Sequence, residues 1–169
     1  MKNETLDKFA PLIGVFSFVA ITTTLITFLR TDYMLMSIGK TFMGMFFLKF
    51  GGFKVYNLEG FKEAFKMYDI LAEKSNIYAT AYPFIEIGLG LLYITLLYSS
   101  NFQLEVFTHS AAILVMGIGG QGVLNALREG RDLKCACLGN VFNVPMTTVT
   151  FVEDFGMALM AAAMLMSVL

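Results

Sequence analysis

Two cysteines stand one residue apart, as Cys135-Ala136-Cys137, in a polar stretch of the chain. A disulfide between them would close a very small ring, and strained disulfides are the labile, exchange-active kind. Two soft thiolates at this spacing would also bind a thiophilic ion such as Cu(I) or Hg(II). Neighbouring Arg131 and Lys134 favour the thiolate in both cases. The pair therefore predicts thiol chemistry or metal binding, and burial as two small apolar residues is a third interpretation.

Charged residues within apolar runs form a second candidate site. Glu86 and Glu153 each lie within a predicted membrane helix, roughly 12 to 14 Å by helical rise from the helix end on the cysteine side. The two carboxylates can therefore lie at the same depth in the membrane. Lys49 and Lys54 lie near the same end of an earlier segment, whereas Lys40 lies nearer the opposite end. The expected polar cluster is Lys49, Lys54, Glu86 and Glu153. Such a cluster serves as a proton relay or polar ligand site, or it fixes helix packing.

His109 is the single histidine, and a predicted membrane-spanning helix lies between it and the two cysteines. From His109 to Arg128 the chain would climb roughly 28 Å, so no joint metal site with the cysteines is expected. An interfacial histidine beside Glu105 is the preferred interpretation. With one histidine, bis-histidine haem and histidine-carboxylate di-iron sites are excluded. No Ser/His/Asp set or phosphate loop is evident.

The run Gly117-Ile-Gly119-Gly-Gln-Gly122 matches the dinucleotide fingerprint G-x-G-x-x-G. That fingerprint works only in a tight turn between a strand and a helix. Here it lies inside an apolar segment, where glycines let neighbouring helices approach closely. We therefore interpret it as a packing feature, with no bound nicotinamide or flavin.

Composition identifies the class of protein that must position these residues. The 169 residues are 57% hydrophobic and 15% charged, and the mean hydropathy is +0.69, which indicates an integral membrane protein. A net charge of −1 predicts no nucleic-acid partner. Two cysteines exclude a disulfide scaffold and a four-cysteine zinc site. A single membrane domain over residues 1–169 is expected.

Hydropathy divides the chain into an all-α bundle of five crossings and one amphipathic helix. The first crossing is long enough to be retained rather than cleaved as a signal peptide. The amphipathic helix should lie at the membrane interface. The predicted crossings are residues 9–29, 34–53, 77–98, 110–127 and 145–169, and the predicted amphipathic helix is residues 58–74.

The distribution of cations gives an orientation. With five crossings, ten of the 12 Lys and Arg residues fall on the side that carries the cysteines. Arg30 falls on the other side and Lys40 within the membrane. The positive-inside rule then puts the N-terminus, the amphipathic helix and the cysteine loop in the cytoplasm.

Several short elements in this order resemble the MauE/DoxX family of small redox-associated membrane proteins. They are Gly-x-x-Lys at residues 51–54, Pro-x-x-Glu at residues 83–86, and the cysteine pair before the last helix, and the similarity covers about residues 37–169. The resemblance implies a four-helix membrane bundle over residues 34–169, with residues 9–29 as an extra helix. It also implies that Cys135 and Cys137 exchange with a thioredoxin-like partner, alongside which such proteins support maturation of a disulfide-rich periplasmic enzyme subunit. That role puts the cysteines on the periplasmic side, opposite to the lysine count.

Three functional hypotheses follow. The first is a thiol-disulfide oxidoreductase of the bacterial cytoplasmic membrane that exchanges with a thioredoxin-like partner. The second is a transport or binding protein for Cu(I) or Hg(II), with Cys135 and Cys137 as metal ligands, methionine thioethers assisting, and a metallochaperone-like partner. The third is a structural helper subunit of a membrane complex. No resident cofactor is expected, although a thiophilic ion or a quinone stays open.

Overall fold

The computed structural model describes residues 2–30, 35–131, 136 and 148–169, and every regular element in those ranges is a helix. The all-helical prediction is therefore confirmed for this part of the chain. The helices are α1 (Lys2–Arg30), α2 (Leu35–Tyr56), α3 (Leu58–Lys66), α4 (Asn76–Thr95), α5 (Phe102–Arg128) and α6 (Thr148–Val168).

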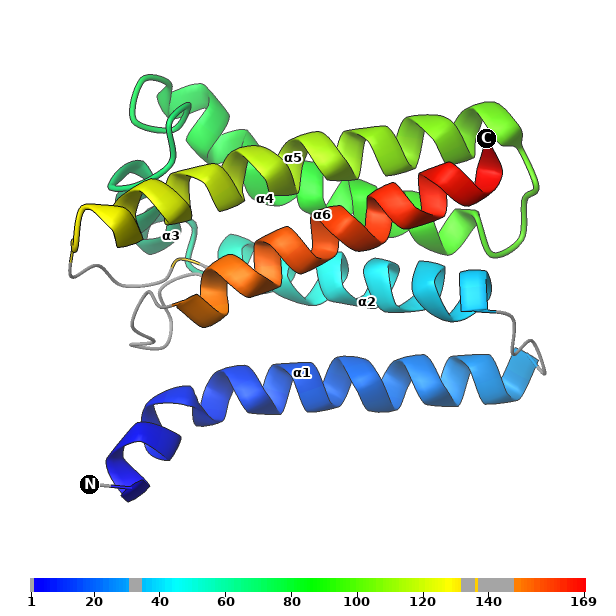
Figure 1. Cartoon of the computed structure of the whole chain (residues 1–169), viewed down its shortest axis with the longest axis horizontal. Coiled ribbons are helices and arrows are strands. Elements are labelled where there is room, and N and C mark those ends of the chain that lie inside the picture. The colour runs from blue at the N-terminus through cyan, green and yellow to red at the C-terminus, as the bar shows by residue number, and fades with distance from the viewer. Residues whose placement is uncertain (1, 31–34, 132–135, 137–147) are drawn as a thin grey trace.

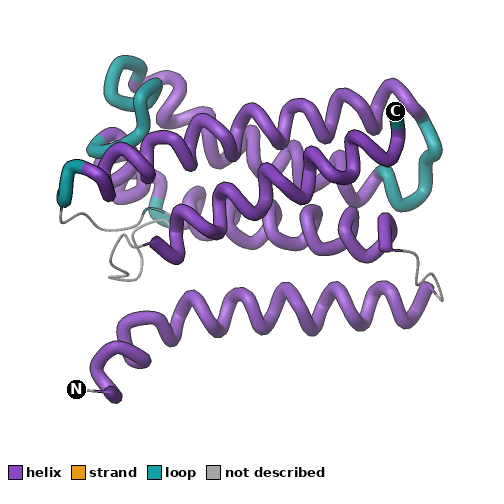
Figure 2. The backbone as a smooth tube through the Cα atoms, in the orientation of Figure 1, coloured by secondary structure: helices purple, strands orange, loops and turns teal. Residues whose placement is uncertain are grey.

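The five long helices lie side by side and alternate in direction along the chain (Figure 1). The largest helix contacts are between α5 and α6, between α2 and α4, and between α1 and α2. As a result α2 is a middle layer, with α1 on one side and α4, α5 and α6 on the other (Figure 2). Short α3 caps the end of the bundle at which α5 ends and α6 begins.

Four of the described helices are long and apolar enough to cross a membrane: Ala10–Arg30 of α1, α4, α5, and Phe151–Val168 of α6. The chain is thus an integral membrane protein. With 22 residues α2 has the length of a crossing, but Lys40, Lys49 and Lys54 make it less apolar. Each of these lysines meets a partner on a different helix, which is how α2 tolerates them between two apolar layers.

The amphipathic segment is shorter than predicted. Asn57 caps α3 by accepting from the Gly60 N–H (3.2 Å), but the helix ends at Lys66 instead of continuing to residue 74. The reason is Asp69, whose Oδ1 accepts from the N–H groups of Leu71 (2.9 Å) and Ala72 (2.8 Å) and thereby starts a new turn. The apolar face of α3 packs inward on the end of the bundle.

Two further boundaries differ from those expected. The helix predicted from residue 110 begins at Phe102, because Asn101 caps it by accepting from the Leu104 N–H at 3.1 Å. Its polar first turns, which carry Glu105 and His109, hid this start from a hydropathy reading. Pro145, expected in the first turn of the last helix, lies outside the described residues.

Glycines bring α2 and α4 close together. A Cβ added at Gly51 would lie 2.8 Å from Ile87 Cγ1 and 3.1 Å from the carbonyl oxygen of Pro83. One turn of α4 further along, a Cβ at Gly90 would lie 3.0 Å from the backbone N of Leu48. These contacts involve backbone atoms, which cannot move aside without shifting a helix.

Replacing Gly51 with alanine should destabilise the chain by about 1–3 kcal/mol, because the added methyl group has no room between α2 and α4. Thermal unfolding in detergent would measure the loss. Gly52→Ala is the matched control, since nothing lies within 4 Å of a Cβ at Gly52. A Gly52→Ala loss equal to that of Gly51→Ala would contradict close packing as the cause.

Candidate functional site

Cys135 and Cys137 themselves lie outside the described residues, but Ala136 between them is described. Ala136 is fully buried, in a cluster at the α3 end of the bundle. Ala136 is the direct sequence neighbour of both cysteines. The cluster around Ala136 contains Phe61, Phe65, Tyr68, Tyr82, Val123 and Ala126.

The turn after α3 holds this part of the chain. The Tyr68 hydroxyl receives a hydrogen bond from the Ala136 backbone. Burial raises the pKa of Tyr68 well above its usual value, with added effects from Asp154 and Asp69, while the bond from Ala136 opposes the shift. Arg131 Nη1 donates to the Met67 carbonyl oxygen at 2.8 Å. Two hydrogen bonds therefore tie Arg131 to Met67 and Ala136 to Tyr68.

The same turn is held firmly against α5. A Cβ added at Gly122 would lie 2.7 Å from the Tyr68 carbonyl oxygen and 3.1 Å from Asp69 Cα. Asp69 is fully buried and uses one carboxylate oxygen for the Leu71 and Ala72 amides. Burial raises the pKa of Asp69, and those two hydrogen bonds oppose the shift.

A buried ion pair lies beside this cluster. Lys54, in the last turn of α2, donates to Glu86 of α4 across 2.5 Å, and the two side chains are 9% and 1% exposed. The Lys54 ammonium also lies 5.0 Å from the ring centroid of Tyr82 and 5.5 Å from that of Phe61. These rings supply a cation-π surface and exclude water from the pair.

Two carboxylates of α6 join this pair. Glu153 is 9% exposed, and both Glu153 and Asp154 lie within electrostatic reach of Lys54 and Glu86. Asp154 faces α5 at Gly119 and Gly120, where added Cβ atoms would lie 3.9 Å from its Oδ2 and 3.4 Å from its Cβ. The positive charge of Lys54 therefore acts on three carboxyl groups, those of Glu86, Glu153 and Asp154.

Unsatisfied oxygens define what the cluster can do. Oε2 of Glu86 and Oε2 of Glu153 are buried without a hydrogen-bond partner. A buried carboxylate oxygen without a hydrogen-bond donor is costly, so each of these two oxygens has an open position for a further donor. In the described part of the chain, no group of three His, Cys, Asp or Glu residues has the geometry to hold a metal ion.

The structure brings together three of the four residues expected in the polar cluster. Lys54, Glu86 and Glu153 lie near one another, whereas Lys49 points to α1, with its ammonium 3.9 Å from the ring centroid of Phe18. A lysine five residues before Lys54 lies on a different face of the helix, so the two cannot meet the same partner. Sequence reasoning missed Asp154, although it follows Glu153 directly.

The opposite end of the bundle holds a second polar cluster. Lys40 pairs with Glu105 at 2.5 Å, and the Tyr93 hydroxyl lies 3.1 Å from His109 Nδ1. His109 is fully buried within the bundle, and Glu105 lies within electrostatic reach of it, as the sequence led us to expect. It lies seven residues into α5, where Tyr93 of α4 covers it.

The glycine run lies within α5, as a packing feature requires. Gly119, Gly120 and Gly122 face Tyr82, Asp154 and the Tyr68 turn, whereas Gly117 faces open space. A helical interior cannot form the strand-to-helix turn of a dinucleotide site. The run instead lets α5 approach α4, α6 and the turn at Tyr68.

Fold and site together define the class of protein. It is a helical integral membrane protein with a buried lysine-carboxylate cluster beside the segment that contains Ala136. A family model described as methylamine utilisation protein MauE matches residues 32–167, so the chain belongs to the MauE family. The match begins after the end of α1 and covers α2 through α6. Searches of curated proteins and of solved structures found no significant match.

Replacing Lys54 with methionine should destabilise the chain by about 3–5 kcal/mol, because Glu86 would stay buried without its partner. Adding Glu86→Gln should recover most of the loss. Thermal unfolding in detergent is the measurement. Lys62→Met is the control, since it breaks a pair with Glu59, which is 79% exposed, and should cost about 1 kcal/mol or less. Equal losses for both single variants would contradict the importance of the buried pair.

Proposed function

We propose that this chain is a membrane accessory protein that exchanges disulfides with a soluble thioredoxin-like partner through Cys135 and Cys137. Its family is named for methylamine utilisation, which suggests that the chain supports the maturation of an enzyme of that process. In the exchange, one thiolate of the partner attacks the Cys135–Cys137 disulfide. It forms a mixed disulfide with one of these two cysteines and releases the second one as a thiolate. The partner's second thiolate then resolves the mixed disulfide, so two electrons pass to the cysteine pair.

The observation that carries the proposal is the burial of Ala136. Ala136, the residue between the two cysteines in the sequence, is packed in the core at the α3 end of the bundle, which supports thiol chemistry at this end. Arg131, close along the chain, adds positive charge that favours the reactive thiolate.

The polar cluster supports the same function. Reduction of the pair consumes protons if both cysteines end as thiols, and the cluster of Lys54, Glu86, Glu153 and Asp154 lies next to the residues that surround Ala136. Tyr82 belongs to both, because its ring contacts Lys54 and packs in the Ala136 cluster. We assign the cluster the role of holding protons near the cysteine pair.

The layout in the membrane is part of the proposal. We infer that α2 is a crossing, so that α2, α4, α5 and α6 form a four-helix core and α1 an extra helix. The short α3 then lies at the interface on the cysteine side. Disulfides form and persist chiefly in oxidising compartments, so we place this side outside a bacterial cytoplasmic membrane, against the lysine count.

A membrane-impermeant maleimide should label the cysteines of intact cells only after mild reduction, because the pair is outside and oxidised. Cys137→Ser is the control: Cys135 then lacks its partner and should react without reduction. Mass spectrometry of the purified chain would count the labels. Labelling that requires permeabilised cells and no reductant would contradict the proposal and favour free cytoplasmic thiols.

Tyr68→Phe should slow thiol-disulfide exchange with a thioredoxin-like protein, because it removes the acceptor for the Ala136 backbone and leaves the cysteine pair less firmly placed. Stopped-flow measurement of exchange gives the rate. Tyr78→Phe is the matched control, since Tyr78 packs on the same Phe65 ring. An unchanged rate in Tyr68→Phe, with the fold intact, would remove Tyr68 from the mechanism.

If client maturation survives loss of both cysteines, the chain is a structural helper subunit instead.

A further inference from the structure

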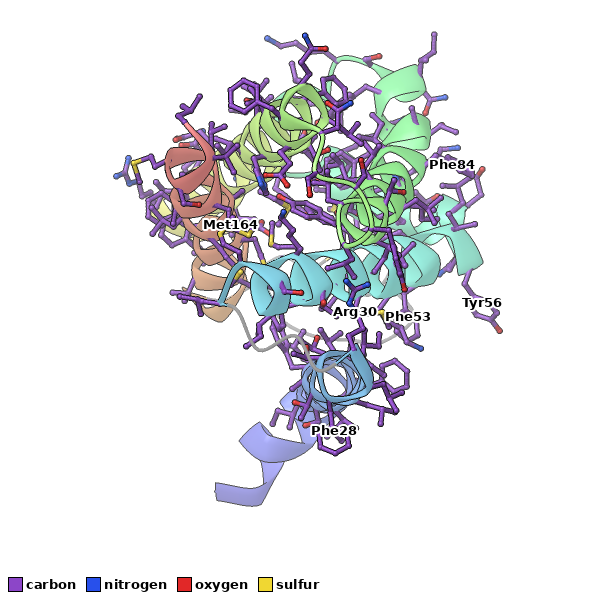
Figure 3. All side chains as sticks on the ribbon, turned by 90° about the vertical axis from the view of Figure 1, so that its right-hand side faces the viewer. Phe28, Arg30, Phe53, Tyr56, Phe84 and Met164 are labelled. Atoms are coloured by element: carbon purple, nitrogen blue, oxygen red, sulfur yellow. The ribbon has the colours of Figure 1, made fainter. Side chains whose placement is uncertain are left out.

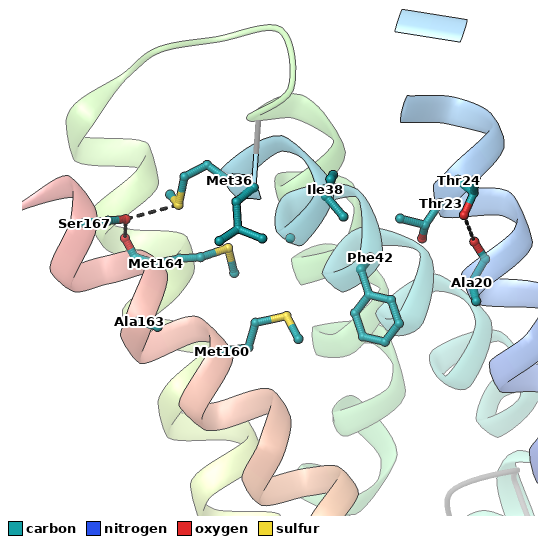
Figure 4. A pocket seen from close by; sticks show the side chains of 12 residues that line it. Ala20, Thr23, Thr24, Met36, Ile38, Phe42, Met160, Ala163, Met164 and Ser167 are labelled. Atoms are coloured by element: carbon teal, nitrogen blue, oxygen red, sulfur yellow. Dashed lines mark hydrogen bonds between the residues drawn. The ribbon is translucent and has the colours of Figure 1, made fainter. Parts of the chain in front are cut away.

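A cavity of about 670 Å³ lies between α1, α2 and α6 (Figure 4). The lining that α2 and α6 supply comes from the start of α2 and the end of α6, at the end of the bundle away from the Lys54–Glu86 pair. The helix α1 packs chiefly on α2 and stands off from α6, which leaves this space open (Figure 3). The described residues that line the cavity include no charged side chain. Its lining is nearly all apolar, apart from a few hydroxyl groups.

Three methionines set this cavity apart from an ordinary gap between helices. Met36 comes from the first turn of α2, and Met160 and Met164 lie one turn apart on the same face of α6. Figure 4 shows all three side chains reaching into the space between the two helices. A Cβ added at Gly39 would lie 3.0 Å from Met164 Sδ, so this glycine allows the sulfur to lie against α2.

The Met36 sulfur keeps a lone pair available. Ser167 Oγ lies 3.1 Å from Met36 Sδ and 2.7 Å from the Met164 carbonyl oxygen. One hydroxyl proton cannot serve both acceptors fully, and the carbonyl oxygen is the nearer and stronger of the two. Ser167 therefore orients the Met36 side chain without occupying its sulfur.

Methionine often fills gaps in a core, and Met43 and Met116 do so here, at 0% and 2% exposure. Met36, Met160 and Met164 differ because all three line one and the same cavity, although Met164 is itself only 5% exposed. Thioether sulfurs are soft, uncharged ligands that prefer Cu(I). Mg²⁺ and Ca²⁺ prefer carboxylate and carbonyl oxygens, and the described residues of this lining offer no carboxylate side chain.

We propose that Met36, Met160 and Met164 form a thioether site that binds Cu(I) within the membrane domain. The site uses none of the cysteines and lies at the other end of the bundle from the polar cluster. It is independent of disulfide exchange, so either function can fail in experiment without the other.

The test uses the full chain with both cysteines replaced by serine, purified in detergent and exposed to Ag(I), a redox-stable analogue of Cu(I). A wild-type sample with alkylated cysteines serves as the second preparation if the serine variant folds poorly. Metal retained after desalting should be about one ion per chain. In Met160→Leu and Met164→Leu, substitutions that keep side-chain volume, the affinity should fall about tenfold or more.

Met157→Leu and Met166→Leu are matched controls on the same helix. Met157 is buried in the core and Met166 is 72% exposed, and neither lines the cavity. Both should bind Ag(I) as the parent chain does. Sulfur scattering in the X-ray absorption spectrum of bound Cu(I) would confirm the ligands. No retained Ag(I), equal loss in Met157→Leu, or Cu(I) bound by oxygen and nitrogen alone would overturn the proposal.

Discussion

The cost of burying charge in an apolar interior governs this bundle. The Lys54–Glu86 pair joins α2 to α4 at 2.5 Å, with both side chains nearly inaccessible. Two charges in such a place are tolerated only when they meet at close range. The contact therefore fixes the register of α2 against α4, and the glycines at residues 44, 51 and 90 provide the close approach that the register requires.

The same constraint explains the position of α2. Its lysines face three directions, to Glu105 of α5, to the Phe18 ring of α1 and to Glu86 of α4. A helix with these residues would be costly on the lipid-facing surface but is well accommodated between two layers. Between the polar ends, Phe46, Phe47, Leu89 and Met116 form a continuous apolar core.

The first helix is related differently to the rest of the chain. It precedes the segment that defines the family, and it packs chiefly on α2. At its end, Arg30 donates to the Leu97 carbonyl oxygen at 2.6 Å and lies over the Tyr98 ring, which anchors α1 to the loop after α4. In Figure 3 Phe28 points away from the bundle while Arg30 points toward it. This one-sided attachment creates the methionine-lined cavity.

Sequence alone determined the membrane class, the approximate helices and the family, because apolar runs of about 20 residues and short ordered motifs are local properties of the chain. It also identified Lys54, Glu86 and Glu153 as costly residues. Tertiary structure decided their partners: Asp154 joined them and Lys49 did not, because rotation about each helix axis determines which side chains meet. It also buried His109 and Ala136, since neighbouring helices supply the contacts that hydropathy does not encode.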